Sequence, residues 1–196
     1  MQASAAGVRS PAMAKRFLVD PTSSTLRVRT RATGLLARLA HDLELVAREM
    51  RGEADDQDGA WTAELVVPVE ALRVAGTLRG DRLDLDGLSP ADREEIQRKL
   101  RSEVLGPGEV HATASGPSRD RGEARITVSG KRGQARVALR VKDEDGALRV
   151  AGESEVSLSQ LGVAEIKGPL GAFKVKDKVS VLFDLVLRPS DETAAG

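Results

Sequence analysis

Residues 147–162, ALRVAGESEVSLSQLG, and residues 176–187, KDKVSVLFDLVL, alternate between apolar and polar side chains along almost their whole length. A period of two with one apolar face is typical of a strand that is buried on one side. Two such strands bury too little apolar surface to be stable alone in water, so the remainder of the chain must supply a sheet. The predicted inward positions are Leu148, Val150, Gly152, Ser154, Val156, Leu158, Val179, Val181, Phe183, Leu185 and Leu187.

The same alternation recurs in shorter segments. We expect further strands at residues 25–32, 44–54, 61–67, 109–115, 123–129 and 134–142. Segments rich in Gly and Asp separate them, and the pairs Ser115, Gly116 and Arg121, Gly122 indicate two of the turns. About eight short strands joined by tight turns predict an all-β fold, an up-and-down antiparallel barrel that either fills with side chains or holds one small ligand.

One segment departs clearly from this pattern. We predict a helix at residues 90–105, because Ser89 can cap it and Pro90 suits its first position. Ile96, Leu100 and Val104 form a narrow apolar stripe along this helix. A stripe this thin does not form the centre of a core, so we expect the helix to cover an edge or a mouth of the barrel.

Other segments are less regular. Leucine spacing predicts a short helix over residues 34–43, and residues 39–50 also fit a helix in place of the strand. Short apolar pairs between Gly and Asp predict that residues 70–88 are mostly loop. We expect one domain at residues 17–189, with flexible tails at residues 1–16 and 190–196, and both Met1 and Met13 stay open as the start.

The composition argues against several classes of function. Lys and Arg together number 30, as do Asp and Glu, so no net field favours nucleic acid or an anionic membrane. Aromatic residues make up 2% of the chain, too few for base stacking, and the absence of Cys excludes disulfides and thiolate metal sites. The sequence has neither the apolar run of a signal peptide nor a stretch of about 20 apolar residues, so we expect a cytoplasmic protein without stable membrane insertion.

Four stretches of the sequence resemble the YceI-like family of lipocalin-like barrels. They are residues 17–21 (FLVDP) with the strand that follows, His41 after that strand, residues 109–115 (EVHATAS), and the terminal pair of residues 159–162 (SQLG) and 175–179 (VKDKV). The resemblance spans about residues 17–187 and implies a bacterial lipocalin-like barrel that binds a polyisoprenoid or an isoprenoid quinone. The chain departs from the family in its charged helix at residues 92–103 and in aliphatic residues, such as Leu161, where the family has aromatic ones.

The predicted inner face combines small residues on several strands with the bulky Trp61 and Phe183. Small side chains leave space in a barrel, and an apolar cavity suits an apolar ligand. The same mixture is also compatible with a barrel that side chains fill completely, and the family resemblance favours the cavity. The candidate ligand-binding residues are Leu26, Val28, Trp61, Ala63, Leu65, Ala112, Ala114, Ile126, Val128, Val137, Leu139, Val150, Gly152, Val181, Phe183 and Leu185.

The sequence contains no motif for nucleophilic catalysis, phosphate binding or dinucleotide binding. With Asp42 or Glu44, the two histidines, His41 and His111, could form a metal site or an acid–base pair. Their spacing matches no metal motif, so we expect one at the barrel mouth and one on the surface. We therefore expect no catalytic residue, no metal and no cofactor other than a bound isoprenoid lipid or quinone.

Arg27, Arg29 and Arg31 give the first predicted strand a basic outer face. Contact with an anionic lipid surface is one explanation. Because the total charge is balanced, we favour a solvated face that pairs with Asp or Glu on a neighbouring strand.

Three hypotheses for function follow. The leading one is a non-enzymatic carrier that buries a long apolar, isoprenoid-like ligand inside the barrel. The second is a packed barrel that acts without ligand as a structural or stress-related interaction module, through its outer face or residues 92–103. The third is an enzyme that acts through His41. A homodimer stays open as a partner in each case.

Overall fold

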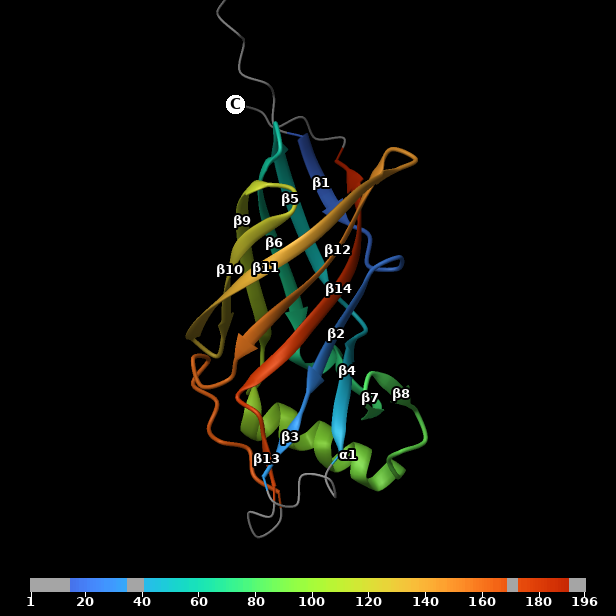
Figure 1. Ribbon diagram of the computed structural model, residues 1–196, viewed down its shortest axis with the longest axis vertical. Coiled ribbons are helices and arrows are strands. Elements are labelled where there is room, and N and C mark those ends of the chain that lie inside the picture. Colours follow the sequence, from blue (N-terminus) through green and yellow to red (C-terminus); the bar gives the residue numbers. More distant parts are fainter. Residues whose placement is uncertain (1–14, 35–40, 169–172, 191–196) are drawn as a thin grey trace, which may run out of the picture.

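The computed structural model describes residues 15–34, 41–168 and 173–190, most of which lie in strands (Figure 1). The strands are β1 (Lys15–Val19), β2 (Thr25–Thr30), β3 (Ala32–Thr33), β4 (Asp42–Ala47), β5 (Arg51–Gln57), β6 (Ala60–Pro68), β7 (Leu72–Arg79), β8 (Arg82–Asp84), β9 (Glu109–Ser118), β10 (Arg121–Val128), β11 (Lys131–Glu144), β12 (Ala147–Ser157), β13 (Lys174–Val175) and β14 (Lys178–Pro189). Helix α1 (Pro90–Lys99) continues as a π-helical segment, Leu100–Val104, and a 3-10 turn spans Val69–Ala71. No helix in these ranges is long and apolar enough to cross a membrane.

Eight strands form a closed antiparallel ring in the order β1-β5-β6-β9-β10-β11-β12-β14. The ring closes where β1 pairs with β14, with Phe17 opposite Pro189 and Val19 opposite Leu187. Closure leaves these strands without the unpaired edges that promote aggregation. The prediction of an all-β, antiparallel lipocalin-like barrel of about eight strands is confirmed.

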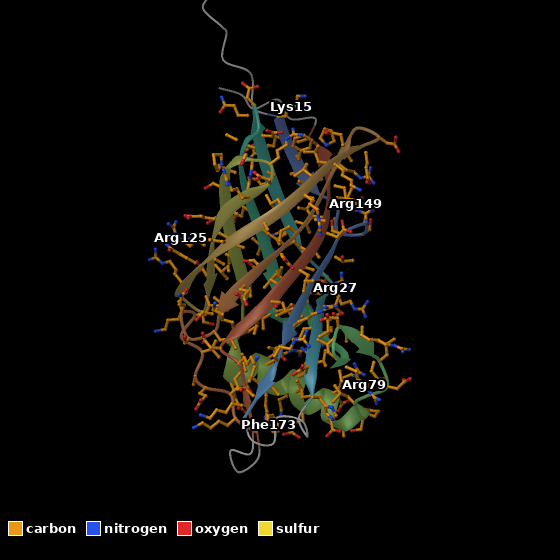
Figure 2. The ribbon with its side chains drawn as sticks, viewed as in Figure 1. Lys15, Arg27, Arg79, Arg125, Arg149 and Phe173 are labelled. Atoms are coloured by element: carbon orange, nitrogen blue, oxygen red, sulfur yellow. The ribbon has the colours of Figure 1, made fainter. Side chains whose placement is uncertain are left out.

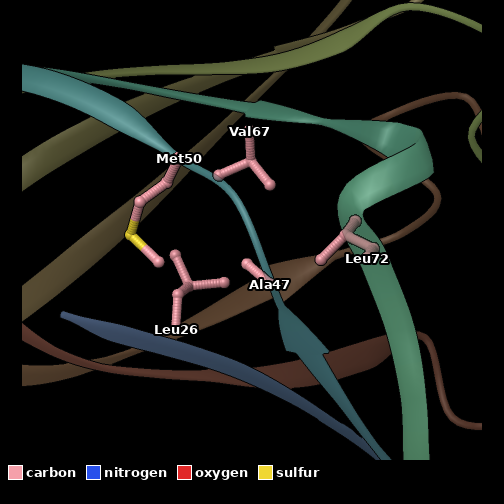
Figure 3. Close-up of a cluster of buried hydrophobic side chains, with 5 residues drawn as sticks. All are labelled: Leu26, Ala47, Met50, Val67 and Leu72. Carbon is pink, nitrogen blue, oxygen red and sulfur yellow. The ribbon is translucent and has the colours of Figure 1, made fainter. Parts of the chain in front are cut away.

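A second group of strands branches from the ring. β14 pairs with β1 near one end and with β2 near the other, and β4, β7 and β8 continue the sheet from β2. A buried cluster lies at this junction, where β4 is followed by β5 and β6 by β7 (Figure 3). Its members are Leu26, Ala47, Met50, Val67 and Leu72.

The two ends of the barrel differ. Helix α1 lies at one end, which we call the helix end (Figure 1). The β5–β6, β9–β10 and β11–β12 turns, at residues 58–59, 119–120 and 145–146, lie at the other, which we call the turn end. Figure 2 places Phe173 at the helix end and Lys15 at the turn end.

Several expectations from the sequence need correction. Residues 70–88 are not mostly loop, because β7 and β8 form a hairpin there. The predicted turn pairs Ser115, Gly116 and Arg121, Gly122 lie inside β9 and β10. The single strand expected at residues 44–54 is two strands, β4 and β5, separated by residues 48–50. Residues 42 and 43 of the expected short helix belong to β4, and its residues 35–40 lie outside the described residues.

The helix predicted at residues 90–105 is present as α1 and the π-helical segment. Ser89 Oγ accepts a hydrogen bond from Asp92 N at 3.1 Å and so caps α1. β1 begins at Lys15, two residues before the expected domain boundary. The remaining residues of the expected tails, 1–14 and 191–196, lie outside the described residues.

Candidate ligand-binding cavity

A cavity of about 730 Å³ lies inside the barrel. Its wall consists mainly of apolar side chains from the ring strands, from β2 and β4, and from the helix. Leu65, Ile126, Leu139, Val181 and Leu185 all line it, and each keeps part of its surface accessible. Protein interiors normally contain few voids larger than a water molecule. A space of this size is therefore a preformed cavity and not a packing defect.

Five alanines form one row across neighbouring strands, which we call the alanine row, and four of them, Ala54, Ala63, Ala114 and Ala124, line the cavity. In the strand register Ala54 lies opposite Ala63, Ala63 opposite Ala114, Ala114 opposite Ala124, and Ala124 opposite Ala135. The row thus crosses five neighbouring strands, β5, β6, β9, β10 and β11. Because a methyl group reaches only a short way into the barrel, the row accounts for much of the open space.

Two aromatic rings lie against the wall instead of across the cavity. Phe183 on β14 covers Gly152, its register partner on β12, and a Cβ atom at Gly152 would lie 2.5 Å from Phe183 Cζ. The indole of Trp61 extends from β6 over Gly116 and Gly122, where a Cβ atom would lie 2.6 Å and 2.7 Å from indole atoms. Glycine inside a strand permits this close approach.

Helix α1 covers the cavity at the helix end. Ile96 of α1 and both Leu100 and Val104 of the π-helical segment line the cavity. These are the residues of the predicted apolar stripe. The expectation that the helix covers a mouth of the barrel is confirmed.

Side chains of α1 hold the helix on β7. Gln97 Nε2 donates to Leu72 O at 2.6 Å, and Gln97 Oε1 accepts from Val74 N at 3.2 Å. The guanidinium of Arg93 donates to Val74 O and Ala75 O, both at 2.7 Å. β8 pairs with only the last three residues of β7. The two side chains therefore satisfy backbone groups that would otherwise lack a strand partner.

Packed side chains close the turn end. Phe17, Leu148 and Leu187 form a buried cluster there, each less than a tenth exposed. Asp56 on β5 forms an ion pair with Arg119 of the β9–β10 turn, and both residues line the cavity. The turn end is therefore the closed end of the cavity.

Polar and charged side chains also line the helix end. His41, Lys99 and Lys167 lie on the cavity wall. Lys99 Nζ is 2.8 Å from Glu95 Oε1, and Lys167 Nζ is 3.1 Å from Glu165 Oε2. Polar groups thus gather at the ends of the cavity, while most side chains between the ends are apolar. This arrangement suits a ligand with an apolar chain and a polar head.

All but two of the predicted ligand-binding residues line the cavity. They are Leu26, Val28, Trp61, Ala63, Leu65, Ala112, Ala114, Ile126, Val137, Leu139, Val150, Val181, Phe183 and Leu185. The exceptions are Val128, which is 2% exposed and packs with Val156 and Val179, and Gly152, which lies beneath Phe183. That the lining residues contact a ligand stays a prediction.

Several lining residues near the helix end were not predicted from the sequence. Leu43 and Leu45 line the cavity from the segment that fitted both helix and strand. Their spacing of two was a usable signal. Phe173 and Val175 line it from the connection between β12 and β14. Among the described residues of this connection, the strand β13 has only two residues, which is too short to show a period.

The two histidines occupy different parts of the barrel. His41 is exposed and lies on the cavity wall at the helix end. His111 lies on the outer face of β9, where its Nε2 is 3.4 Å from Glu109 Oε2 and its Nδ1 is 3.9 Å from Glu64 Oε1. Within the described residues no three His, Asp or Glu side chains are grouped so that they could hold a metal ion.

Arg29 and Arg31 on the basic outer face of β2 are paired, as predicted, and this face is less solvated than expected. Arg29 Nε is 2.7 Å from Glu44 Oε2, and Arg31 Nη1 is 3.1 Å from Asp42 Oδ2. The β7–β8 turn covers part of this face, because Arg31 also donates to Gly80 O at 2.8 Å. Glu44 is only 3% exposed as a result.

Comparison with solved structures shows a likeness of fold. The crystal structure of BcnA from Burkholderia cenocepacia matches with a TM-score of 0.61 and 14% sequence identity, over 86% of this chain and 98% of the BcnA chain. No protein-family model matches the sequence, and no curated protein matches it. At this identity the likeness concerns the fold alone.

Proposed function

We propose that this chain is a non-enzymatic binding protein that carries a long apolar ligand inside its barrel. The observation that supports this most is the cavity of about 730 Å³, which falls within the roughly 300–1,000 Å³ of small-molecule sites. Its apolar wall would bind an apolar chain by removing it from water, at about 25 cal/mol per Å² of apolar area. The closed barrel and its likeness to BcnA are consistent with such a container.

The ligand that fits best is isoprenoid-like, a polyisoprenoid or an isoprenoid quinone. Branched aliphatic side chains dominate the cavity wall, and they offer methyl-rich surfaces to a methyl-branched chain. Residues 17–21 (FLVDP) with the strand that follows, His41, residues 109–115, and residues 159–162 with 175–179 carry the resemblance to YceI-like proteins. Membership of that family is part of this proposal.

A barrel that works as a packed interaction module accounts less well for the interior. Side chains that fill a barrel leave few voids larger than a water molecule. Here the alanine row and the two wall-bound rings leave a continuous space. An empty apolar space of this size forgoes dispersion contacts that a packed core would make, so a protein that needs only its outer surface has no use for it.

Native mass spectrometry of the freshly purified protein, followed by solvent extraction, tests the proposal. We expect a stoichiometric apolar adduct of isoprenoid mass, or uptake of one after incubation with isoprenoid quinones and polyprenyl alcohols. A mass equal to that of the bare chain, unchanged after these incubations, would overturn the carrier function and favour the interaction module.

A further inference from the structure

A ligand needs a route into the cavity, and the ring of strands is closed by backbone hydrogen bonds. β12 and β14, for example, pair from Leu148 opposite Leu187 to Ser157 opposite Lys178. Passage between two such strands would break several backbone hydrogen bonds at once. At the turn end the Phe17 cluster closes the barrel. The helix end is therefore where a route can open.

Two segments cover the helix end, and they are attached to the barrel in different ways (Figure 1). The β12–β14 connection is joined through its backbone, because Lys176 N donates to Arg31 O at 2.7 Å and β13 pairs with β3. Among the described residues, α1 makes no backbone-to-backbone hydrogen bond to any strand. Helix α1 is thus the covering element that can move without breaking a pair of backbone groups.

Apolar packing contributes little to the attachment of α1. None of its residues, Pro90–Lys99, is buried. Within this fully described helix only Ile96 and Lys99 line the cavity, and only Ile96 is apolar. Elements with few buried apolar contacts open locally at a lower cost in free energy than the rest of a fold. A movement of α1 alone is therefore the least costly way to open the barrel.

Polar side chains hold the helix in place instead. Arg93 and Gln97 bond to the backbone of β7 at residues 72–75. Arg93 Nη2 also donates to Leu85 O at 2.8 Å. Neither side chain lines the cavity. We call Arg93 and Gln97 the latch, because their loss would loosen the helix without removing a contact to a ligand.

The far end of the helix is fixed. At Leu100 its geometry changes from α to π, and π-helical turns are frequent at functional sites. Leu105 follows this turn and packs against the buried clusters of Leu26 and of Val128. Ser129 Oγ also donates to Leu105 O at 2.6 Å. The turn at Leu100 is therefore the point about which α1 can swing.

We propose that α1 is the gate through which the ligand enters and leaves, and that Arg93 and Gln97 hold this gate shut. Opening moves α1 away from β7 about the turn at Leu100 and uncovers the cavity at the helix end. This inference rests on the proposed carrier function and adds to it the route of exchange. Arg93 and Gln97 act as positioning residues, since they set how often the gate opens.

Stopped-flow measurements on the full-length protein test the gate. They give the association and dissociation rate constants of geranylgeraniol, an isoprenoid alcohol, from the fluorescence of Trp61. Arg93→Ala and Gln97→Ala should raise both rate constants about fivefold or more, with less than about a twofold change in Kd, because each loses hydrogen bonds of the latch and no ligand contact. Gln97→Met keeps the length of the side chain without its hydrogen bonds, and should do the same if Gln97→Ala folds poorly.

Two control variants separate the latch from a general loss of stability. Arg98→Ala changes another arginine of α1, whose partner is Glu103 at 4.0 Å and not β7. Arg149→Ala removes two hydrogen bonds to Asp184, of 2.8 Å and 2.7 Å, from the wall of the ring. Both should exchange the alcohol at wild-type rates. In the ligand-free latch variants, hydrogen exchange should be faster in α1 and unchanged in β12 and β14.

The outcomes separate this inference from the proposed function. A wild type that binds no geranylgeraniol overturns the carrier function and the gate together. Binding with wild-type rate constants in all three latch variants overturns the gate alone, as does an equal rise in Arg149→Ala. Faster dissociation with an equal rise in Kd also overturns it, because the latch would then stabilise the bound state instead of controlling entry. Faster association and dissociation confined to the latch variants support the gate.

Discussion

Phe183 and Gly152 lie opposite each other on β14 and β12, and the phenyl ring covers the glycine. A Cβ atom at position 152 would lie 2.5 Å from Cζ and 2.9 Å from Cε2 of the ring. The ring therefore occupies the space that a side chain at this position would take. Gly152 does not line the cavity, yet it lets Phe183 stay against the wall and so keeps the cavity open.

Gly152→Ala should destabilise the protein by about 2 kcal/mol, because the added methyl group must displace the ring and also meets the carbonyl oxygen of Ala138. Urea unfolding of both proteins measures this difference. In a Phe183→Leu background the same change should cost about 1 kcal/mol less, since the smaller side chain no longer reaches the glycine. Strictly additive effects of the two substitutions would contradict the proposed contact.

Ala114→Phe should block ligand uptake. Ala114 lies in the middle of the alanine row, between Ala63 and Ala124, so a phenyl ring there projects into the space where a chain would lie. We expect the affinity for a four-unit isoprenoid alcohol to fall by about tenfold or more, with little loss of stability, because the ring fills open space and does not overpack a core. Titration of the alcohol followed by intrinsic Trp61 fluorescence gives the affinity.

Thr113→Phe is the matched control for that variant. Thr113 precedes Ala114 on β9, is exposed and faces outward. The control should bind the alcohol as the wild type does. Equal affinities for all three proteins would mean that the alanine row does not contact the ligand.

The alternating segments allowed the inner and outer faces of most strands to be predicted from the sequence. Along β12 and β14 a slip of one residue would place Arg149 and Asp184 inside the barrel, so the register is strongly determined. The apolar stripe of the helix was equally informative, because Ile96 and Leu100 lie about one helical turn apart and both line the cavity. The hydrophobic period and the helix-capping signal were sufficient to predict these strands and this helix.

The β4–β7–β8 region could not be predicted in the same way, because both of its faces are covered. Glu44 and Leu45 are adjacent and both buried, since the β7–β8 turn and Arg29 cover the outer face of β4. A register shift between these two residues also breaks the alternation. Burial on both sides removes the difference between polar and apolar positions on which the period depends.

The glycines of the cavity wall were also ambiguous in the sequence. Gly116 and Gly122 were predicted to be turn residues, because Gly is frequent in turns. In the structure they lie inside strands and seat the indole of Trp61. Whether a glycine is needed for a turn or for the close approach of an aromatic ring depends on the neighbouring strand. The fold, and not the local sequence, determines which strand is the neighbour.

Asp20 should make the stability of the barrel depend on pH in the acidic range. Hydrogen bonds from the hydroxyl of Thr22, then from Arg188 and Ser23, lower the pKa of Asp20 far below its ordinary value of 3.8. A lowered pKa in the folded state stabilises the protein above the pKa of the unfolded chain, and the effect is lost as pH falls further towards the folded value. Wild type should therefore have a higher Tm than Asp20→Asn at pH 7, and the difference should shrink below about pH 4.

Tm measured between pH 7 and pH 2 checks this expectation. Thr22→Ala removes one donor at 2.6 Å and leaves the carboxylate in place. It should reduce the stabilisation at pH 7 by less than Asp20→Asn does. A Tm difference between wild type and Asp20→Asn that is as large at pH 2 as at pH 7 would contradict the assignment.

Glu44→Gln should destabilise the protein by about 3 kcal/mol, because it leaves the guanidinium of Arg29 without its closest charge partner in a buried position. The side chains of Glu44 and Arg29 are 3% and 17% exposed, and Oε2 and Nε are 2.7 Å apart.

Glu155→Gln is the control, since its partner Lys178 is 3.4 Å away and both side chains are about two-thirds exposed, so its effect on stability should be small. Replacing both members of the buried pair, by Arg29→Met with Glu44→Leu, should recover most of the loss, because no charge then remains buried. Urea unfolding gives the free energy of unfolding of the wild type, the two single variants and the double variant. Equal values for the Glu44 and Glu155 single variants would show that burial does not set the strength of the Arg29–Glu44 pair.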